Sequence, residues 1–207
     1  MLQIDPLIIV DIIGIIAFTV SGFLVGAKNR LDILGLMIAA SLTALGGGIV
    51  RDTILTVTPF AFKTLYPALA LLTVIFLSFA LKIHRFDNLE KRWLFVISDT
   101  IGLVAFSITG ALLAINAGYN FFGVIILSFI TAMGGGVIRD ILINQVPAVL
   151  ISDFYGSISI IVSILLLLLH VSGFLNQTTI IAVAIFSIAL RIIAYKKEWH
   201  LPKIEIE

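Results

Sequence analysis

The sequence predicts an all-α integral membrane protein whose helices form two inverted three-helix repeats followed by a seventh helix. Two observations predict this fold class. First, 60% of the 207 residues are hydrophobic, 12% are charged and the mean hydropathy is +1.20, whereas a soluble domain is about half apolar and about a quarter charged. Second, one pattern of apolar segments, glycines and charged residues occurs twice along the chain. The absence of cysteine excludes disulfides and thiolate metal sites.

Seven segments are long and apolar enough to cross a bilayer, which takes about 20 predominantly apolar residues. Short polar or proline-containing stretches separate them. The expected spans are residues 7–27, 33–58, 64–83, 93–115, 121–146, 148–171 and 178–195. These spans form one transmembrane domain, residues 1–207, with repeat one at about 7–83, repeat two at about 93–171, the seventh helix at about 178–195 and a tail at 196–207.

The distribution of positive charge assigns the topology. Ten Lys and Arg residues fall on the side that holds the first loop, the third loop and the C-terminus, and only Lys63 falls on the other side. Arg51 and Arg139 lie within spans and are not counted. Because cytoplasmic loops carry the excess of Lys and Arg, we expect the N-terminus outside the cell and the C-terminus in the cytoplasm.

The internal repeat aligns without gaps at an offset of 88 residues. Between positions 11 and 59, 17 of 49 aligned pairs are identical, including Asp11 with Asp99 and Thr43 with Thr131. Each repeat holds three spans, an odd number, so the second copy enters the membrane from the opposite side. Folds of this kind place their site near the midplane, where interrupted helices from both halves meet.

Both repeats carry the motif Gly-Gly-Gly-x-x-Arg-Asp inside an apolar span. Each glycine in a helix costs roughly 1 kcal/mol relative to alanine. Small residues also allow close helix packing, but three in a row exceed what packing needs. We therefore predict that the second and fifth helices break at the triplets and that the freed backbone lines a polar cavity. The triplet residues are Gly46, Gly47 and Gly48, and Gly134, Gly135 and Gly136.

The charged residues of the motif are predicted to form two clusters, one near each side of the membrane. Adjacent helical residues point about 100° apart, so the Arg and Asp of one pair do not simply neutralise each other and should seek further partners. Helix rise and the repeat symmetry place one more carboxylate at the depth of each pair. The expected clusters are Asp11 with Arg51 and Asp52, and Asp99 with Arg139 and Asp140. Each could be a structural ion pair or the lining of an ion path.

Other polar residues carry weaker signals. The hydroxyls of Thr43 and Thr131 either satisfy a carbonyl of their own helix or line a polar path. Asp153 has no counterpart in the first repeat, where the offset gives Leu65, and it either pairs with an arginine or faces the path. No nucleophile stands beside a base, so we do not expect an enzyme. Without a basic groove containing aromatic residues, we do not expect nucleic-acid binding.

With its two Gly-Gly-Gly-x-x-Arg-Asp motifs, the chain resembles the prokaryotic members of the trimeric intracellular cation (TRIC) channel family. It equally resembles the bacterial membrane proteins with glycine-transporter domains. The resemblance covers nearly the whole chain and implies a homotrimer among the lipids of the prokaryotic cytoplasmic membrane. It implies that each protomer has its own pore for K⁺ and Na⁺. The glycine triplets would line this pore and offer these ions transient backbone sites, with no other cofactor.

The animal channels carry a Lys-Glu-Val motif on the fifth span, where this chain has only Arg139 and Asp140 as charged residues. Lipid-linked or calcium-linked gating is therefore not expected to carry over. The function expected from the resemblance is a monovalent cation channel. The alternative is a secondary transporter of glycine or another small zwitterion, in which an arginine would meet the carboxylate and an aspartate the ammonium group.

Overall fold

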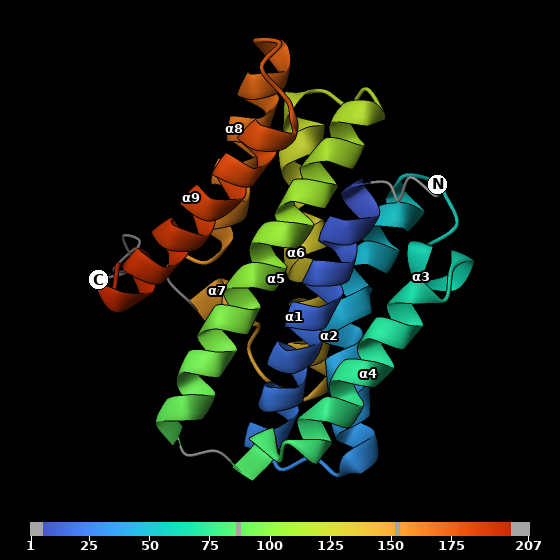
Figure 1. Cartoon of the computed structure of the whole chain (residues 1–207), viewed down its shortest axis with the longest axis vertical. Helices are drawn as coiled ribbons and strands as arrows, with labels where there is room; N and C mark the ends of the chain where they lie inside the picture. Colours follow the sequence, from blue (N-terminus) through green and yellow to red (C-terminus); the bar gives the residue numbers. More distant parts are fainter. Residues whose placement is uncertain (1–5, 86–87, 152–153, 200–207) are drawn as a thin grey trace, which may run out of the picture.

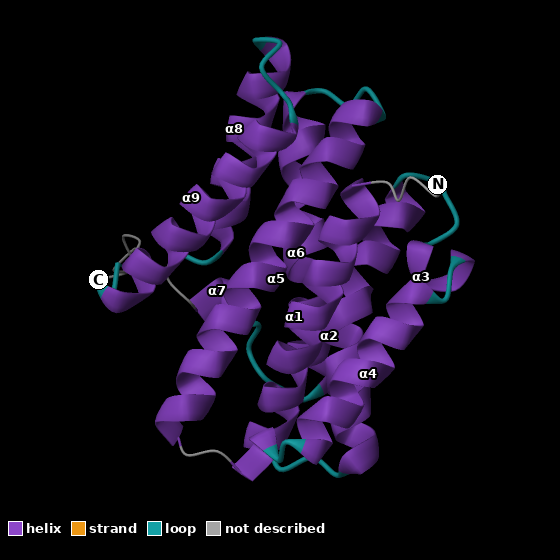
Figure 2. Cartoon of the chain, in the orientation of Figure 1, coloured by secondary structure: helices purple, strands orange, loops and turns teal. Residues whose placement is uncertain are grey.

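The computed structural model describes residues 6–85, 88–151 and 154–199, without the side chains of residues 88–91. Within these ranges the chain is helical, with loops and turns between the helices (Figure 2). The first repeat comprises α1 (Pro6–Lys28), α2 (Ile33–Ile54), α3 (Phe60–Lys63), α4 (Tyr66–Ala80) and the 3₁₀ turn η1 (Ile83–Arg85). The second comprises α5 (Asn88–Asn116), α6 (Phe121–Leu142), α7 (Ala148–Ile151) and α8 (Gly156–Val171), and α9 (Gln177–Lys196) follows. Asp153 lies outside the described residues.

Five of the described helices, α1, α2, α5, α6 and α9, are long and apolar enough to cross a membrane. Helices α4 and α8 are apolar but have 15 and 16 residues, fewer than the roughly 20 that a perpendicular span needs. The predicted start of the sixth span at residue 148 is wrong, because the chain forms the short α7 there and α8 begins only at Gly156. A short helix, α3, likewise precedes α4.

The two repeats run in opposite directions. Helices α2 and α6 begin and end 88 residues apart, and so do α3 and α7. In Figure 1, α1 runs downward from the N-terminus, while α5 beside it runs upward. Their contacts agree: Gly14 on α1 lies against Phe106, and Gly102 on α5 lies against Phe18. Side chains late in one helix therefore meet side chains early in the other, as an inverted repeat requires.

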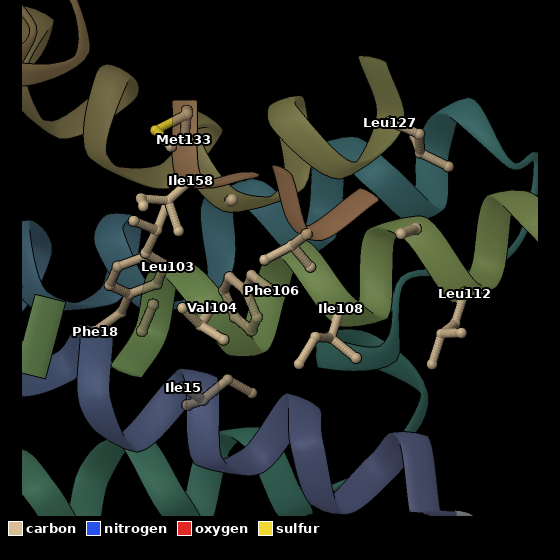
Figure 3. Packing of buried hydrophobic residues seen from close by; sticks show 14 of the residues in the cluster. Ile15, Phe18, Leu103, Val104, Phe106, Ile108, Leu112, Leu127, Met133 and Ile158 are labelled. Carbon is tan, nitrogen blue, oxygen red and sulfur yellow. The ribbon is translucent and has the colours of Figure 1, made fainter. Parts of the chain in front are cut away.

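The core is centred on α1 and α5 and extends to the neighbouring helices, α6 and α8 among them (Figure 3). Phe18 and Phe106 are repeat-equivalent, and their rings meet edge to face with centroids 5.3 Å apart. A Cβ at Gly14 would lie 2.5 Å from the Phe106 ring, and one at Gly102 would lie 2.4 Å from the Phe18 ring. Each phenylalanine therefore occupies space that a glycine of the other repeat leaves free, which brings the two halves into close contact.

Helices α2 and α6 touch backbone to backbone at the glycine triplets. A Cβ built on Gly47 would lie 2.0 Å from the carbonyl oxygen of Thr131, and one on Gly135 would lie 2.3 Å from that of Thr43. Real Cβ atoms essentially never approach so closely, so no larger residue fits either position without moving a helix. The triplets thus provide the close packing typical of small residues at membrane helix interfaces.

The predicted helix breaks are wrong. Both α2 and α6 run without interruption through their triplets. The physical reason is that a freed carbonyl in hydrocarbon costs several kcal/mol, more than the roughly 1 kcal/mol that a glycine costs a helix. Because both helices are continuous, they leave no free backbone carbonyls for K⁺ or Na⁺. A transient cation site at the triplets therefore stays a prediction, and helix breaks no longer support it.

Helix α9 has no counterpart in the first repeat and packs against α5 and α8, as Figure 1 also shows. Near its C-terminal end, Tyr195 stacks edge to face on Trp93 of α5, with ring centroids 5.8 Å apart. The Arg92 side chain donates a hydrogen bond to the Tyr195 hydroxyl. The seventh helix therefore covers one side of the second repeat only, and this makes the molecule asymmetric.

Candidate functional site: two buried arginine–aspartate clusters

The first cluster, Asp11, Arg51 and Asp52, is a network of charge-assisted hydrogen bonds. Arg51 Nη1 and Nη2 donate to Oδ1 and Oδ2 of Asp11 at 2.8 and 3.0 Å, a bidentate pair, and its Nε donates to Asp52 Oδ1 at 2.7 Å. The three residues are 2–7% exposed. Charges this deeply buried persist only when they are paired and hydrogen-bonded, and here one guanidinium serves two carboxylates.

Two further bonds tie the first cluster to its surroundings. Arg51 Nη1 also donates to Thr109 Oγ1 on α5 at 3.1 Å. The second oxygen of Asp52 accepts the backbone N–H of Phe60, the first residue of α3, at 2.8 Å. The cluster thereby joins α1, α2, α3 and α5. The carboxylate at the start of α3 also stabilises that short helix, since helix N-termini attract negative charge.

The second cluster, Asp99, Arg139 and Asp140, repeats only part of this network. Arg139 donates from Nε to Asp140 Oδ1 at 2.9 Å, and Asp140 Oδ2 accepts the backbone N–H of Ala148, at the start of α7, also at 2.9 Å. Arg139 Nη1 reaches Thr43 Oγ1 on α2 at 3.3 Å. Its closest charged partner in the described structure is therefore its own neighbour in sequence.

Asp99 is buried but makes no ion pair with any described residue. It accepts a hydrogen bond from Ser21 Oγ of α1 at 2.9 Å. The expectation that it would partner Arg139 as Asp11 partners Arg51 is therefore wrong. The two repeats hold the same residues at equivalent positions but bond them differently.

All six side chains are buried, 2–7% exposed, and therefore face the protein interior. Against the expectation, Arg and Asp pair with each other in both repeats, but Arg51 also takes the further partner that was expected, Asp11. A guanidinium on a long flexible side chain folds back onto the preceding turn and reaches the next residue's carboxylate.

The space around the two clusters differs more than their bonding. The first cluster borders a cavity of about 20 Å³, whose lining includes Gly48, Phe60 and Phe106. Arg139 and Asp140 border a cavity of about 550 Å³. A further cavity of about 430 Å³ reaches Arg139 from the side of α2. The protein is therefore tightly packed around the first cluster and hollow around the second.

The large cavity is amphipathic. Its polar lining comprises Lys28, Asn29, Arg92, Arg139, Asp140 and Gln145, and its apolar lining comprises Leu24, Val25, Phe95, Val146, Ala148 and Ile151. Three cationic side chains thus face it with one carboxylate. Gln145 donates a hydrogen bond to Asn29 at 2.6 Å. Because Asn29 borders both larger cavities, this hydrogen bond lies at the boundary between the two cavities.

The candidate threonines are not placed alike. Thr43 donates to the Ala39 carbonyl at 2.7 Å and accepts from Arg139, so it belongs to the second cluster. Thr131 donates to the Leu127 carbonyl at 2.6 Å and is fully buried. Among the glycines, Gly48 borders the small cavity, while Gly47 and Gly135 lie in the helix crossing. A path lined by Thr131 and all six glycines stays a prediction.

Some contributors escaped the sequence reasoning. The capping amides of Phe60 and Ala148 follow Pro59 and Pro147, which align at the 88-residue offset, so the repeat could have pointed to them. The described histidines, His84 and His170, take no part, and the described residues contain no group of three His, Cys, Asp or Glu side chains that could hold a metal ion.

Comparison with protein families adds independent findings. The family model described as "Glycine transporter" matches residues 8–82 and again 96–171. The UPF0126 membrane protein YvgT of Bacillus subtilis is 34% identical over 199 residues, which cover 94% of each chain. A UPF0126 membrane protein of Vibrio cholerae is 32% identical over 197 residues, which cover 94% of this chain and 80% of its own.

Solved structures share the fold over nearly the whole length. A chain solved to explain conductance through TRIC cation channels is 34% identical, with a TM-score of 0.84, and the match covers 98% of this chain and 99% of that one. A prokaryotic TRIC channel crystallised in 0.5 M KCl is 32% identical, with a TM-score of 0.85, over 94% of this chain and 98% of its own. The TRIC trimeric intracellular cation channel orthologue from Rhodobacter sphaeroides is 27% identical, with a TM-score of 0.84.

Proposed function

This chain belongs to the family that unites the glycine-transporter domain with the TRIC cation channels, and we propose that it is itself a monovalent cation channel. In this proposal K⁺ and Na⁺ cross the cytoplasmic membrane of a prokaryotic cell through one pore in each protomer of a homotrimer. The N-terminus lies outside and the C-terminus in the cytoplasm. The orthologue described as trimeric and the distribution of positive charge in the loops support the assembly and the orientation.

One observation carries the proposal: two buried carboxylate clusters contact α1 at two different depths. Arg51 of the first cluster meets Thr109 of α5, and Asp99 of the second meets Ser21 of α1. Asp11 and Ser21 share a helix and are ten residues apart, so the clusters are roughly 15 Å apart along its axis. A carboxylate near a narrow, low-dielectric path attracts cations and repels anions.

The described structure is the closed state of such a path. A cavity reaches Asp140 from one end, whereas Asp52 at the other end borders a space of only about 20 Å³, room for about one water molecule. The bidentate pair between Arg51 and Asp11 joins α2 to α1 at that point. Conduction in this proposal requires Arg51 to release Asp11.

Purified protein in a planar bilayer tests the function. We expect discrete current steps whose reversal potential follows the K⁺ gradient and changes little when chloride is replaced by a large anion. The second candidate is an alternating-access transporter of glycine or another small zwitterion. Two observations favour it: the family description, and a structure that is closed at just one of its two ends. Saturable exchange of labelled glycine in proteoliposomes, without current steps, would establish that transporter and reject the channel.

A further inference from the structure

The large cavity beside the second cluster carries a charge that the ion pair in its wall does not balance. Lys28, Arg92 and Arg139 line it together with a single carboxylate, that of Asp140. Arg139 and Asp140 pair with each other, so their charges offset. Lys28 and Arg92 form no ion pair with any described carboxylate. The wall of the cavity is therefore positive, and these two residues carry the charge.

Of these two cations, Arg92 is the one that the structure holds in place. Its guanidinium donates a hydrogen bond to the Tyr195 hydroxyl of α9. The guanidinium carbon also lies 5.4 Å from the centroid of the Tyr195 ring, within the range of a cation–π interaction. Because a tyrosine is neutral, it fixes the arginine without cancelling its charge, as a carboxylate would. Lys28 makes no such contact with a described residue.

Tyr195 is in turn held where the last turn of α9 meets α5. Its ring packs edge to face on Trp93, with centroids 5.8 Å apart. The Lys196 ammonium nitrogen lies 5.6 Å from the centroid of the Trp93 ring, so neighbouring residues of both helices interlock. At the 88-residue offset Arg92 aligns with Ile4, and α9 has no counterpart in the first repeat. The fixed positive charge therefore belongs to one end of the molecule only.

We propose that Arg92 sets the charge preference of the large cavity, and that Tyr195 is the positioning residue that holds Arg92 in the cavity wall. A sphere of about 550 Å³ is about 10 Å across, one Debye length at 0.1 M salt, so a charge in the wall acts on the whole space. Without Tyr195 the long side chain of Arg92 is free to turn its charge into solvent. This preference against cations bears on ion flux only if the proposed function holds, whereas the charge itself is a property of the cavity.

The absence of cysteine from the chain allows a test that does not depend on conduction. Val25 lines the large cavity and is partly buried, so Val25→Cys places a single thiol in its wall. The thiol is modified at low ionic strength with two methanethiosulfonate reagents, one carrying a sulfonate and the other a trimethylammonium group. The ratio of the anionic to the cationic rate reports the charge of the cavity, because the exposure and reactivity of the thiol affect both rates alike.

We expect Arg92→Gln in this background to lower the ratio about fourfold, which Coulomb's law gives for two opposite unit charges about 10 Å from the arginine in a water-filled space. Tyr195→Leu should lower it in the same direction but by less, because a released Arg92 still spends part of its time in the wall. In the Arg92→Gln background, Tyr195→Leu should have no further effect.

Two controls make the result specific. Lys196→Gln removes a positive charge next to Tyr195 in sequence, but Lys196 lies over Trp93 and does not line the cavity, so the ratio should stay the same. A thiol at the exposed Ala117, just beyond the opposite end of α5 from Arg92, should give one ratio in all variants. A tyrosine that only packs α9 against α5 would not change the charge preference through Arg92.

The outcomes separate this inference from the proposed function. An unchanged ratio in folded Arg92→Gln protein overturns the role of Arg92 even if the channel conducts. A ratio that Tyr195→Leu leaves unchanged, or lowers equally with and without Arg92, overturns the positioning role. If Tyr195→Leu fails to fold, Tyr195→Phe, which keeps the ring and loses the hydrogen-bond acceptor, decides by the same criteria. Absence of current from the parent protein, with the ratios as expected, rejects the channel and leaves both roles intact.

Discussion

The two clusters show how the same three residues make a closed end and an open end of one molecule. At the first, Arg51 satisfies Asp11 and Asp52 together, and about 20 Å³ of space remains. At the second, Arg139 satisfies Asp140 alone and borders about 550 Å³. The difference teaches that a buried arginine closes a helix interface only when it bridges two helices, and that a pair between neighbours on one helix leaves the space open.

The largest expected effect comes from removing the arginine that bridges helices. Arg51→Met leaves Asp11 and Asp52 buried without a cation, at a cost of about 3–5 kcal/mol. Arg139→Met leaves Asp140 beside a cavity large enough for water, and should cost about 1–3 kcal/mol. Thermal unfolding of the purified variants, followed by size-exclusion chromatography, measures both. Adding Asp11→Asn should recover part of the loss in Arg51→Met, and equal losses in the two single variants would contradict the comparison.

A slightly smaller effect is expected at the helix crossing that both clusters share. Gly47→Ala and Gly135→Ala force a Cβ against the Thr131 and Thr43 carbonyls, and overpacking of this kind costs about 1–3 kcal/mol. Gly48→Ala is the matched control, because the atom nearest to its Cβ would be Arg51 Nη2, at 3.9 Å. That variant should gain up to about 1 kcal/mol from helix propensity. If Gly47→Ala were as stable as Gly48→Ala, the glycines would not be explained by packing.

The clusters should also differ in conduction. Asp140→Asn removes the carboxylate paired with Arg139 and leaves a cavity facing only cationic charge, so we expect cation conductance to fall about tenfold. Asp52→Asn leaves Arg51 paired with Asp11, and we expect a loss of about twofold. Because the two sites lie toward opposite ends of the path, the variants should rectify current in opposite directions. Folded variants with parental conductance and selectivity in a bilayer would remove the carboxylates from the path.

The smallest expected difference is between the two repeat-equivalent threonines. Thr43→Val removes an acceptor of Arg139 and should cost about 1 kcal/mol. Thr131→Val removes a hydroxyl whose bond in the described structure goes to its own helix, at Leu127, and should change stability by less than about 0.5 kcal/mol. Thermal unfolding of the two variants tests whether the difference between the clusters extends to the crossing of α2 and α6. If both substitutions lowered stability equally, the difference would be confined to the charged residues.

The parts of the fold that depend on local chemistry could be predicted from the sequence. Helices α2 and α6 begin at the expected residues, 33 and 121, because Asp32 and Asn120 cap them by accepting the N–H groups of Gly35 and Gly123. The predicted helix breaks were wrong because the helix propensity of glycine, which is measured in water, was applied to helices that are not surrounded by water. The triplets do not break their helices, since the contact that they permit between α2 and α6 offsets their cost.

The candidate site could be predicted as a set of residues but not as a set of bonds. Symmetry indicated that Arg51 and Arg139 would behave alike, and Asp11 does pair with Arg51. Asp99 departs from this pattern: it accepts a hydrogen bond from Ser21 of α1, while Arg139 bonds Asp140 and Thr43. Contacts of that kind depend on how the helices pack, and no periodicity or spacing in the chain encodes them.

The glycine crossing between α2 and α6 has a consequence for how such a chain can diversify. Gly47 meets Thr131, and Gly135 meets Thr43, so each half offers the other the same surface. In an ancestor made of two identical chains with one repeat each, any substitution would have altered both ends of the path at once. A single chain that carries both repeats is free of that constraint. Position 67 can hold proline while position 155 holds tyrosine, and the two ends can acquire separate tasks.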